Sequence, residues 1–227
     1  MRRDYDARIS RARLLTKKFP ASAKLLDFYI QLATLQKQIY AALPGTPPSA
    51  HLPALIDIVK SDGPDPLVRY AAHPDRTELT PESRFFSLIL EQPQAEYDAV
   101  HRPAVLAASP TCPQCGSRPV AAILRGEGEG AKRSLLCSLC STEWPFRRVL
   151  CPNCAGEDKD RLPIYTADGI DYVRVEACDT CRSYIKAVNL TKDGFAIPEV
   201  DELATVALDV WADEHGYSKL EPNILGM

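Results

Sequence analysis

Residues 137–154 read CSLCSTEWPFRRVLCPNC, in which two Cys-x-x-Cys pairs stand ten residues apart. Four cysteines so close together can bind one metal ion, or each pair can belong to a different site with partners elsewhere in the chain. The first arrangement makes this stretch one tight loop, and the second makes it the junction between two modules. The remaining cysteines distinguish between the two arrangements.

All eight cysteines of the 227-residue chain lie between residues 112 and 181, in four Cys-x-x-Cys pairs. A gap of two residues lets both sulfurs face one ion while backbone amides donate to the thiolates. Laid against itself, the region contains two copies of about forty residues with the same order of pair, arm, pair and tail. The arms are 21 and 23 residues long. The close pairs in 137–154 therefore belong to different copies.

Each arm predicts a β-hairpin, because two runs of strand-forming residues flank a turn signal. The turn is the glycine-rich GEGEG in the first copy and Asp168-Gly169 in the second. The predicted strands are residues 120–124 and 132–136 in the first copy, and 162–166 and 170–175 in the second. A hairpin returns its second cysteine pair beside its first, which predicts two tetrahedral four-sulfur sites.

The predicted metal ligands are Cys112, Cys115, Cys137 and Cys140 in the first site, and Cys151, Cys154, Cys178 and Cys181 in the second. Protein fills every ligand position, so hydrolytic metal catalysis is disfavoured. Structural zinc and rubredoxin-like iron both fit, and the spacing does not choose between them. A disulfide framework, or a single site with four spare thiols, is the alternative interpretation. Trp144, just after the second pair, is expected to shield the first site from water.

The N-terminal region, residues 1–110, contains no cysteine and predicts a small all-helical domain. Helices are expected in the basic stretch before residue 19, from Ala21 to about residue 43, over 52–60 and over 65–72. Thr80 followed by Pro81-Glu82 is typical of a helix start, and predicts a helix through FFSLILEQ (85–92). A further helix is expected near 94–108.

After the second copy, PEVDELATVALDVWADEHG (198–216) predicts one amphipathic helix that ends at Gly216. Its apolar residues, Val200, Leu203, Val206, Ala207, Val210 and Trp211, fit either a core face against the metal modules or a partner-docking face. The predicted class is α+β. It comprises a helical domain (1–110), two tandem rubredoxin-like or zinc-ribbon modules (111–150 and 151–195), and a C-terminal helix with its tail (196–227).

Composition narrows the function. No apolar run approaches the roughly 18 residues of a membrane span, and the basic N-terminal stretch lacks the apolar segment of an export signal. We therefore expect a cytoplasmic protein with reduced thiols. The formal charge of −3 gives no bias toward nucleic acid. A nucleic-acid-binding zinc ribbon remains an alternative, as does a thiol or electron-transfer redox protein.

Four segments together resemble the FdhE family of formate dehydrogenase accessory proteins. They are CPQCGS (112–117), LLCSLCSTEWPFRRVLCPNC (135–154), VEACDTCRSYIKAV (175–188) and DELATVALDVWADEHGY (201–217). The resemblance is close over about residues 110–220 and looser over the N-terminal helices. It implies a cytoplasmic, chaperone-like factor that binds the catalytic subunit of a molybdenum- or tungsten-dependent formate dehydrogenase and has no turnover of its own. It also favours rubredoxin-type iron on the eight cysteines.

Overall fold

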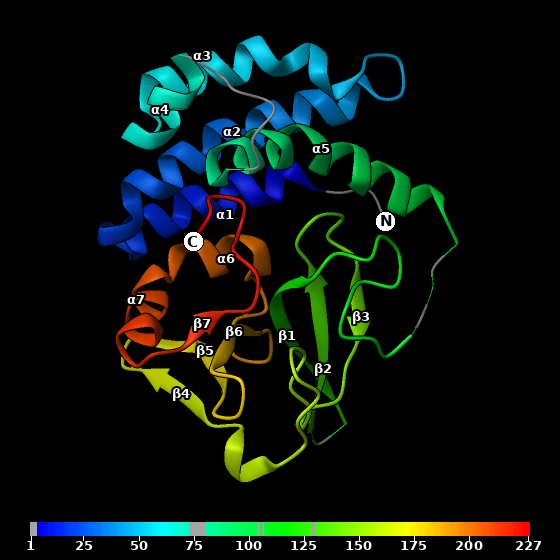
Figure 1. Ribbon diagram of the computed structural model, residues 1–227, viewed down its shortest axis with the longest axis vertical. Coiled ribbons are helices and arrows are strands. Elements are labelled where there is room, and N and C mark those ends of the chain that lie inside the picture. Colours follow the sequence, from blue (N-terminus) through cyan, green and yellow to red (C-terminus); the bar gives the residue numbers. More distant parts are fainter. Residues whose placement is uncertain (1–3, 73–79, 104, 106, 129) are drawn as a thin grey trace.

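The computed structural model describes residues 4–72, 80–103, 105, 107–128 and 130–227. Five helices gather at one end of the molecule, and the strands fill the other (Figure 1). The helices of this layer are α1 (Tyr5–Lys18), α2 (Ala23–Ala42), α3 (Leu52–Asp62), α4 (Asp65–Ala72) and α5 (Pro81–His101). The predicted helical N-terminal region is therefore confirmed.

Side-chain caps and apolar stripes explain these helices. Asp4 accepts a hydrogen bond from the Ala7 amide at 2.8 Å and starts α1. Thr80 and Ser83 form a reciprocal capping box at the start of α5, directly before Pro81. The apolar stripes of α2 to α5 then form one core, which includes Phe28, Leu32, Leu35, Ile39, Leu55, Val59, Phe85, Phe86 and Ile89.

Helix α5 differs from its prediction, because it runs unbroken through Pro93 to His101 and replaces the two expected helices. Proline has no amide hydrogen, so the Ile89 carbonyl one turn earlier loses its helical partner. Gln36 of α2 donates from Nε2 to this carbonyl at 3.2 Å. A side chain from another helix thus satisfies the group that the proline leaves free, and the helix continues.

The strands follow the predicted hairpins. They are β1 (Pro119–Glu127), β2 (Gly130–Cys137), β3 (Glu143–Pro145), β4 (Ile164–Ala167), β5 (Ile170–Cys178), β6 (Ser183–Asn189) and β7 (Ser218–Lys219). Each cysteine copy forms an antiparallel three-stranded unit, β1-β2-β3 in the first and β4-β5-β6 in the second. The repeat seen in the sequence is therefore also a repeat of strand topology.

The two units share one sheet, in the order β3-β2-β1-β6-β5-β4. The junction is a parallel pairing in which Ala121–Leu124 of β1 lies beside Lys186–Asn189 of β6. The central residues of both strands are buried. Helices cover one face of the sheet, and on the other face Ala122 and Ala187 pack in a cluster with Trp144 and Phe146. The two metal modules are consequently halves of a continuous sheet.

The C-terminal helix is broken into α6 (Pro198–Ala204) and α7 (Val206–Glu214), with Thr205 between them. Lys186 of β6 reaches this break and donates from Nζ to the Glu202 carbonyl at 2.5 Å. Thr205 Oγ1 donates to the Asp201 carbonyl at 2.9 Å. Side chains therefore satisfy carbonyls at the end of α6, and the chain turns into a second helix.

Helix α6 lies between the sheet and helices α1 and α2. Val200 and Leu203 are fully buried in a cluster with residues of α1 and α2, so this part of the predicted apolar stripe is core. Val210 of α7, by contrast, is 54% exposed. Among the described residues, no helix is both long and apolar enough to span a membrane.

Candidate metal centres

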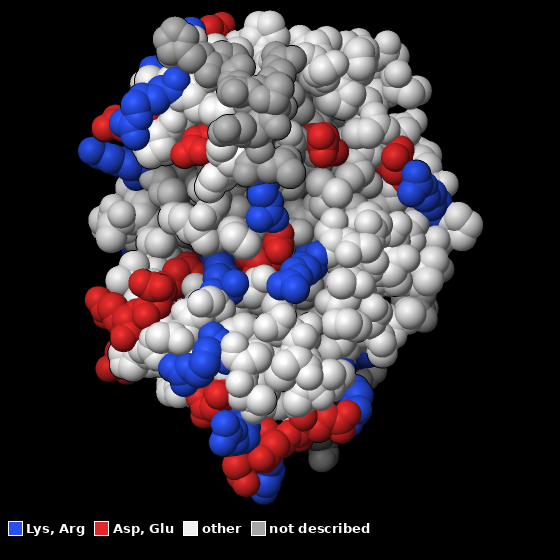
Figure 2. All heavy atoms as spheres, viewed as in Figure 1, with Lys and Arg blue, Asp and Glu red and all other residues white. Residues whose placement is uncertain are grey.

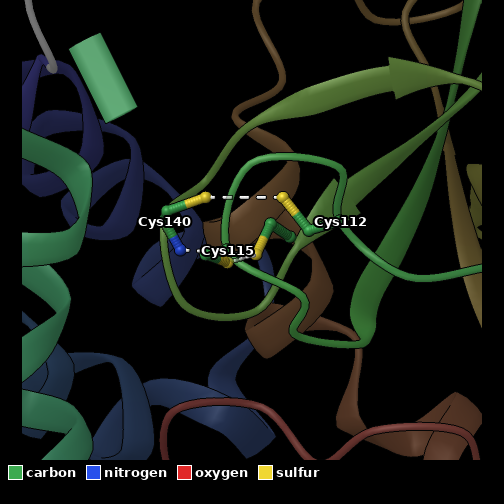
Figure 3. Close-up of side chains that lie close together, drawn as sticks. Cys112, Cys115 and Cys140 are labelled. Carbon is green, nitrogen blue, oxygen red and sulfur yellow. Dashed lines mark hydrogen bonds between the residues drawn. The ribbon is translucent and has the colours of Figure 1, made fainter. Parts of the chain in front are cut away.

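The eight cysteines lie in the two groups expected from the repeat, and within each group the four sulfurs all lie within 4.8 Å of one another. In the first group, Sγ of Cys112 and Cys140 are 3.6 Å apart, and Sγ of Cys115 and Cys137 are 3.3 Å apart. Figure 3 shows the labelled side chains of this group turned toward a common centre. In the second group, the Cys151–Cys181 and Cys154–Cys178 distances are each 3.7 Å.

These distances fit a tetrahedral thiolate site. A zinc–sulfur bond of about 2.3 Å places neighbouring sulfurs of a tetrahedron about 3.8 Å apart. A disulfide would instead bring two sulfurs to about 2.05 Å, and all eight cysteines are free. The residues present therefore fit two closed four-sulfur metal sites, and the disulfide framework is not formed. Four thiolates suit zinc and iron equally, so the geometry leaves the metal open.

The backbone of each knuckle explains how two nearby sulfurs turn to the same side. The residue directly after the second cysteine of each pair has a positive φ: Gly116 (+80°), Ser141 (+51°), Ala155 (+57°) and Arg182 (+57°). This left-handed conformation is strained for residues other than glycine. In the first pair, the Gly116 amide donates to the Cys112 carbonyl at 2.8 Å, which closes the turn. The sulfur geometry is thus built into the local backbone.

Backbone amide hydrogens point at sulfurs of both sites, as thiolates require. Backbone amides donate to Cys112 Sγ from Gln114 and to Cys151 Sγ from Asn153, each at 3.4 Å. Leu139 and Cys140 amides do the same for Cys137 Sγ. Hydroxyls stand at equivalent places in the two copies, with Thr142 Oγ1 3.1 Å from Cys140 Sγ and Ser183 Oγ 3.0 Å from Cys181 Sγ.

Each site presents one cysteine outward. Cys115 and Cys154, the second residue of the first pair in each copy, are exposed. Trp144 is buried in the cluster that contains Cys112, Cys137 and Cys140, and donates from Nε1 to the Ser109 carbonyl at 2.8 Å. Its position fits the predicted shielding of the first site, which stays a prediction.

The first site is tied to the helical layer by α5. Gln92 Nε2 donates to the carbonyl of Ser138, which lies between the cysteines of the 137–140 pair, at 2.9 Å. One helical turn later, Glu96 accepts from the Ser141 hydroxyl at 2.6 Å. The second knuckle of this site is therefore held by two polar side chains of one helix.

Glu96 is fully buried and has hydrogen-bond donors on both oxygens. Tyr5 OH donates to Oε2 and Arg8 Nη2 to Oε1, each at 2.7 Å. Burial alone would raise the pKa of Glu96, but the Arg8 guanidinium and the hydrogen bonds outweigh burial and hold the pKa below its usual value. Arg8 also pairs with Glu199 of α6 at 2.8 Å. A charged network thus joins α1, α5 and α6 at the first metal site.

Sequence reasoning missed Gln92 and Glu96, although a signal was present. The buried residues of α5 include Phe85, Ile89, Gln92 and Glu96, at successive spacings of three or four. Two polar residues therefore continue an apolar helical stripe into the interior. A buried polar group requires a partner, and here the partner is a metal-site knuckle.

Fold and site together define a class of protein: a helical layer on a sheet that carries two closed four-cysteine centres. Residues 111–148 match the family model described as FdhE, central domain, and residues 149–225 match FdhE, C-terminal domain. The two matches adjoin and cover just over half of the chain. The chain therefore belongs to the FdhE family.

Related proteins agree with this assignment. A protein FdhE homolog of Aquifex aeolicus is 41% identical over 116 residues, which are 51% of this chain and 41% of that protein. A homolog of the same name from Pseudomonas putida is 38% identical over 119 residues, 50% of this chain and 37% of its own. The matched segment thus spans well under half of these relatives. The crystal structure of the FdhE protein from Pseudomonas aeruginosa superposes with a TM-score of 0.75 at 21% identity, covering 99% of this chain and 97% of that one, so the fold is shared.

Proposed function

We propose that this protein is an accessory factor of a formate dehydrogenase that binds the catalytic subunit of that enzyme in the cytoplasm and supports its maturation or activity. The match of residues 111–225 to the two FdhE domains is the observation that carries this proposal. The protein acts by binding and has no turnover of its own. The helical layer and the C-terminal helices hold the client, and the metal modules fix the shape of the sheet.

The closed coordination of both centres supports a role without hydrolysis. Four cysteine sulfurs would complete a tetrahedral ion in each site, which would leave no position for a substrate or a water nucleophile. A bound iron would supply one-electron chemistry, and a bound zinc would supply stability alone. The protein's own part is to orient the sulfurs, to donate amide hydrogens to them and to expose Cys115 and Cys154. Iron is the favoured metal on family resemblance.

The surface charges favour a protein client over nucleic acid. Figure 2 shows a face on which Lys and Arg stand beside Asp and Glu, without a continuous basic surface. Binding to a phosphate backbone needs such a surface. In addition, each four-thiolate site with a divalent ion carries a charge of about −2, which repels phosphates.

The experiment is capture of the client in the host from which the chain comes. The tagged chain replaces the chromosomal copy, mild crosslinking is applied, and captured proteins are identified by mass spectrometry. We expect the catalytic subunit of a formate dehydrogenase among them, and we expect formate oxidation to fall when the gene is deleted. Capture without any formate dehydrogenase subunit, together with unchanged formate oxidation in the deletion strain, would refute the proposal.

A matched pair of variants separates the metal sites from the rest of the surface. Cys137→Ser breaks the first site, whereas Lys192→Ala changes an exposed side chain after β6, outside both cysteine groups and outside the helices. The first variant is expected to lose formate dehydrogenase activity in the deletion strain and the second to restore it. Equal restoration by both would show that the first metal centre is not needed for the accessory role.

A further inference from the structure

A cavity of about 230 Å³ lies between the two cysteine modules, next to the second metal site. Cys151 and Cys178 form part of its wall, as do residues of β2, β5 and β6. Ile185 of β6 faces the cavity, while the next residue, Lys186, binds Glu202 of α6 on the other side of the sheet. The cavity is therefore on the face of the sheet that α6 does not cover.

The cavity wall is strongly basic. It contains four cationic side chains and one carboxylate: Arg133, Arg148, Lys159, Arg174 and Glu176. Glu176 already accepts from Arg133 at 2.8 Å and from Arg174 at 2.6 Å. In the described part of the chain, neither Arg148 nor Lys159 has a carboxylate within ion-pairing distance. Two exposed cations at the cavity thus have no ion-pair partner in the described part of the chain.

Neutralisation of the second metal site is the competing explanation for these cations. The groups within hydrogen-bonding distance of its sulfurs are not these cations but the Asn153 amide, at 3.4 Å, and the Ser183 hydroxyl, at 3.0 Å. The guanidinium of Arg148 instead donates to the Ala131 carbonyl at 3.4 Å, a long hydrogen bond outside the site. The basic groups therefore make no hydrogen bond to the thiolates among the described residues. The four cations of the wall still exceed Glu176 and the charge of about −2 on a metal-loaded second site by about one positive charge, which is available to a ligand.

The rim of the cavity is apolar and points outward. Val149 and Ile164, which line it, are 44% and 53% exposed. Ile164 belongs to β4, which ends the sheet and so leaves one side of its backbone without a strand partner among the described residues. Pockets that enclose a whole small organic ligand measure roughly 300–1,000 Å³, whereas this one is smaller. Its size and apolar rim suit the side chains of a bound polypeptide whose remainder lies outside the cavity.

We propose that the cavity beside the second metal site binds an acidic segment of a partner protein, in which a carboxylate meets Arg148 and Lys159 and a neighbouring aliphatic side chain packs on Val149 and Ile164. Charge complementarity and the apolar rim both favour this occupant. A bound segment lies against the second four-cysteine site. The proposal rests on the accessory function only in that such a role needs a client surface. It adds a contact at the metal modules to the helices that hold the client, and it is tested without formate dehydrogenase.

The test is selection from a displayed library of random peptides on the full metal-loaded chain. Selected peptides are then titrated by fluorescence anisotropy against the wild type and the double variant Arg148→Ala/Lys159→Ala. The matched control is Arg147→Ala/Arg161→Ala, which removes the same charge from exposed residues of the same segment that do not line the cavity. Elemental analysis establishes that every protein holds two metals, which excludes an effect through the metal site.

We expect the selected peptides to carry Asp or Glu next to an aliphatic residue. Their affinity is expected to fall about tenfold in the cavity variant, to stay unchanged in the control and to weaken with salt. Recovery of no peptide, peptides without acids, or equal binding to the cavity variant would overturn the proposal. If inorganic phosphate displaces the peptides and binds as tightly as they do, the cavity is a small-anion site, and this result would also overturn the proposal. Each of these failures leaves the accessory role of the chain intact.

Discussion

The buried carboxylate of Glu96 connects the helical layer to the first metal site, and its replacement by glutamine tests that connection. Glu96→Gln keeps the shape of the side chain but removes its charge. The variant leaves Arg8, whose side chain is 6% exposed, with Glu199 as its remaining carboxylate partner among the described residues and with the Ser141 hydroxyl as a further acceptor at 3.1 Å. It also weakens the hydrogen bonds that Glu96 accepts from Tyr5 and from Ser141, the residue after Cys140.

The expected loss of stability follows from burial. Removing one partner of a buried ion pair costs about 3–5 kcal/mol. We expect the lower end, about 3 kcal/mol, because Glu199, with its side chain 24% exposed, still offsets part of the Arg8 charge. For a chain of this size, each 1 kcal/mol lowers the midpoint of thermal unfolding by about 2–4 °C. The expected decrease is therefore about 6–12 °C.

The assay is thermal unfolding of the metal-loaded protein followed by circular dichroism. The control is Asp6→Asn on α1, which removes an ion pair with Lys37 whose side chains are 72% and 49% exposed. An exposed pair contributes about 0–1 kcal/mol, so this midpoint should move by at most about 4 °C. A decrease for Glu96→Gln no larger than that of the control would refute the inferred network. Faster metal release from Glu96→Gln to a chelator would show that the network steadies the Ser141 knuckle.

The difference between wild type and Glu96→Gln should also depend on pH in a defined way. The pKa of Glu96 is held below its usual value, with burial opposed by Arg8 and by the hydrogen bonds. The stabilisation by its charge is therefore complete above the unfolded-state pKa of about 4.3 and is lost as the pH falls through the lower folded-state value. Midpoint differences should be equal at pH 7 and pH 5. A difference that narrows in this range would contradict the assigned charge state.

Three further changes test the sites and the helix layer. Cys137→Ser should reduce the metal content from two ions to one in elemental analysis, and retention of two tightly bound ions would refute the cysteine grouping. Gln36→Ala should lower the free energy of unfolding, measured in urea, by about 1–3 kcal/mol, because the Ile89 carbonyl loses the hydrogen bond from Gln36. Exposed Gln38→Ala should leave stability unchanged, and equal effects of the two variants would refute this explanation. Gly116→Ala should lower the free energy of unfolding by about 1–2 kcal/mol, because the φ of +80° is strained for alanine. The added Cβ meets no atom within 4 Å, so a steric clash does not contribute. Gly45→Ala should change stability little, because its φ lies outside the left-handed region and the added Cβ would make an ordinary contact at 3.5 Å with the Ala42 carbonyl oxygen. A similar loss in both variants would exclude backbone strain as the cause.

The sequence predicted the parts of this protein that depend on short-range spacing. The grouping of the eight cysteines followed from the repeat and from two hairpins, and the structure places them in those groups. The second hairpin begins at Ile164, two residues later than expected. Turn signals, knuckle spacing and amphipathic stripes depend on residues that are close together in the sequence, so they can be recognised without knowledge of the fold.

The features that the sequence missed depend on hydrogen bonds between residues far apart in the chain. The sequence predicted two helices, through 85–92 and near 94–108, where the structure has one, because Gln36, more than fifty residues before Pro93, satisfies the carbonyl that this proline frees. The break at Thr205 likewise depends on Lys186, a residue of the sheet.

By itself, the sequence determined two four-cysteine centres on hairpins, a helical region before them and an amphipathic segment after them. The tertiary structure decided that the two centres share one sheet through the parallel pairing of β1 with β6. It also placed Glu96 at the first centre, where three side-chain donors, from Tyr5, Arg8 and Ser141, offset the cost of burying its charge. The physical reason is that a buried polar group needs a partner, but the chain does not specify locally which distant residue will supply it.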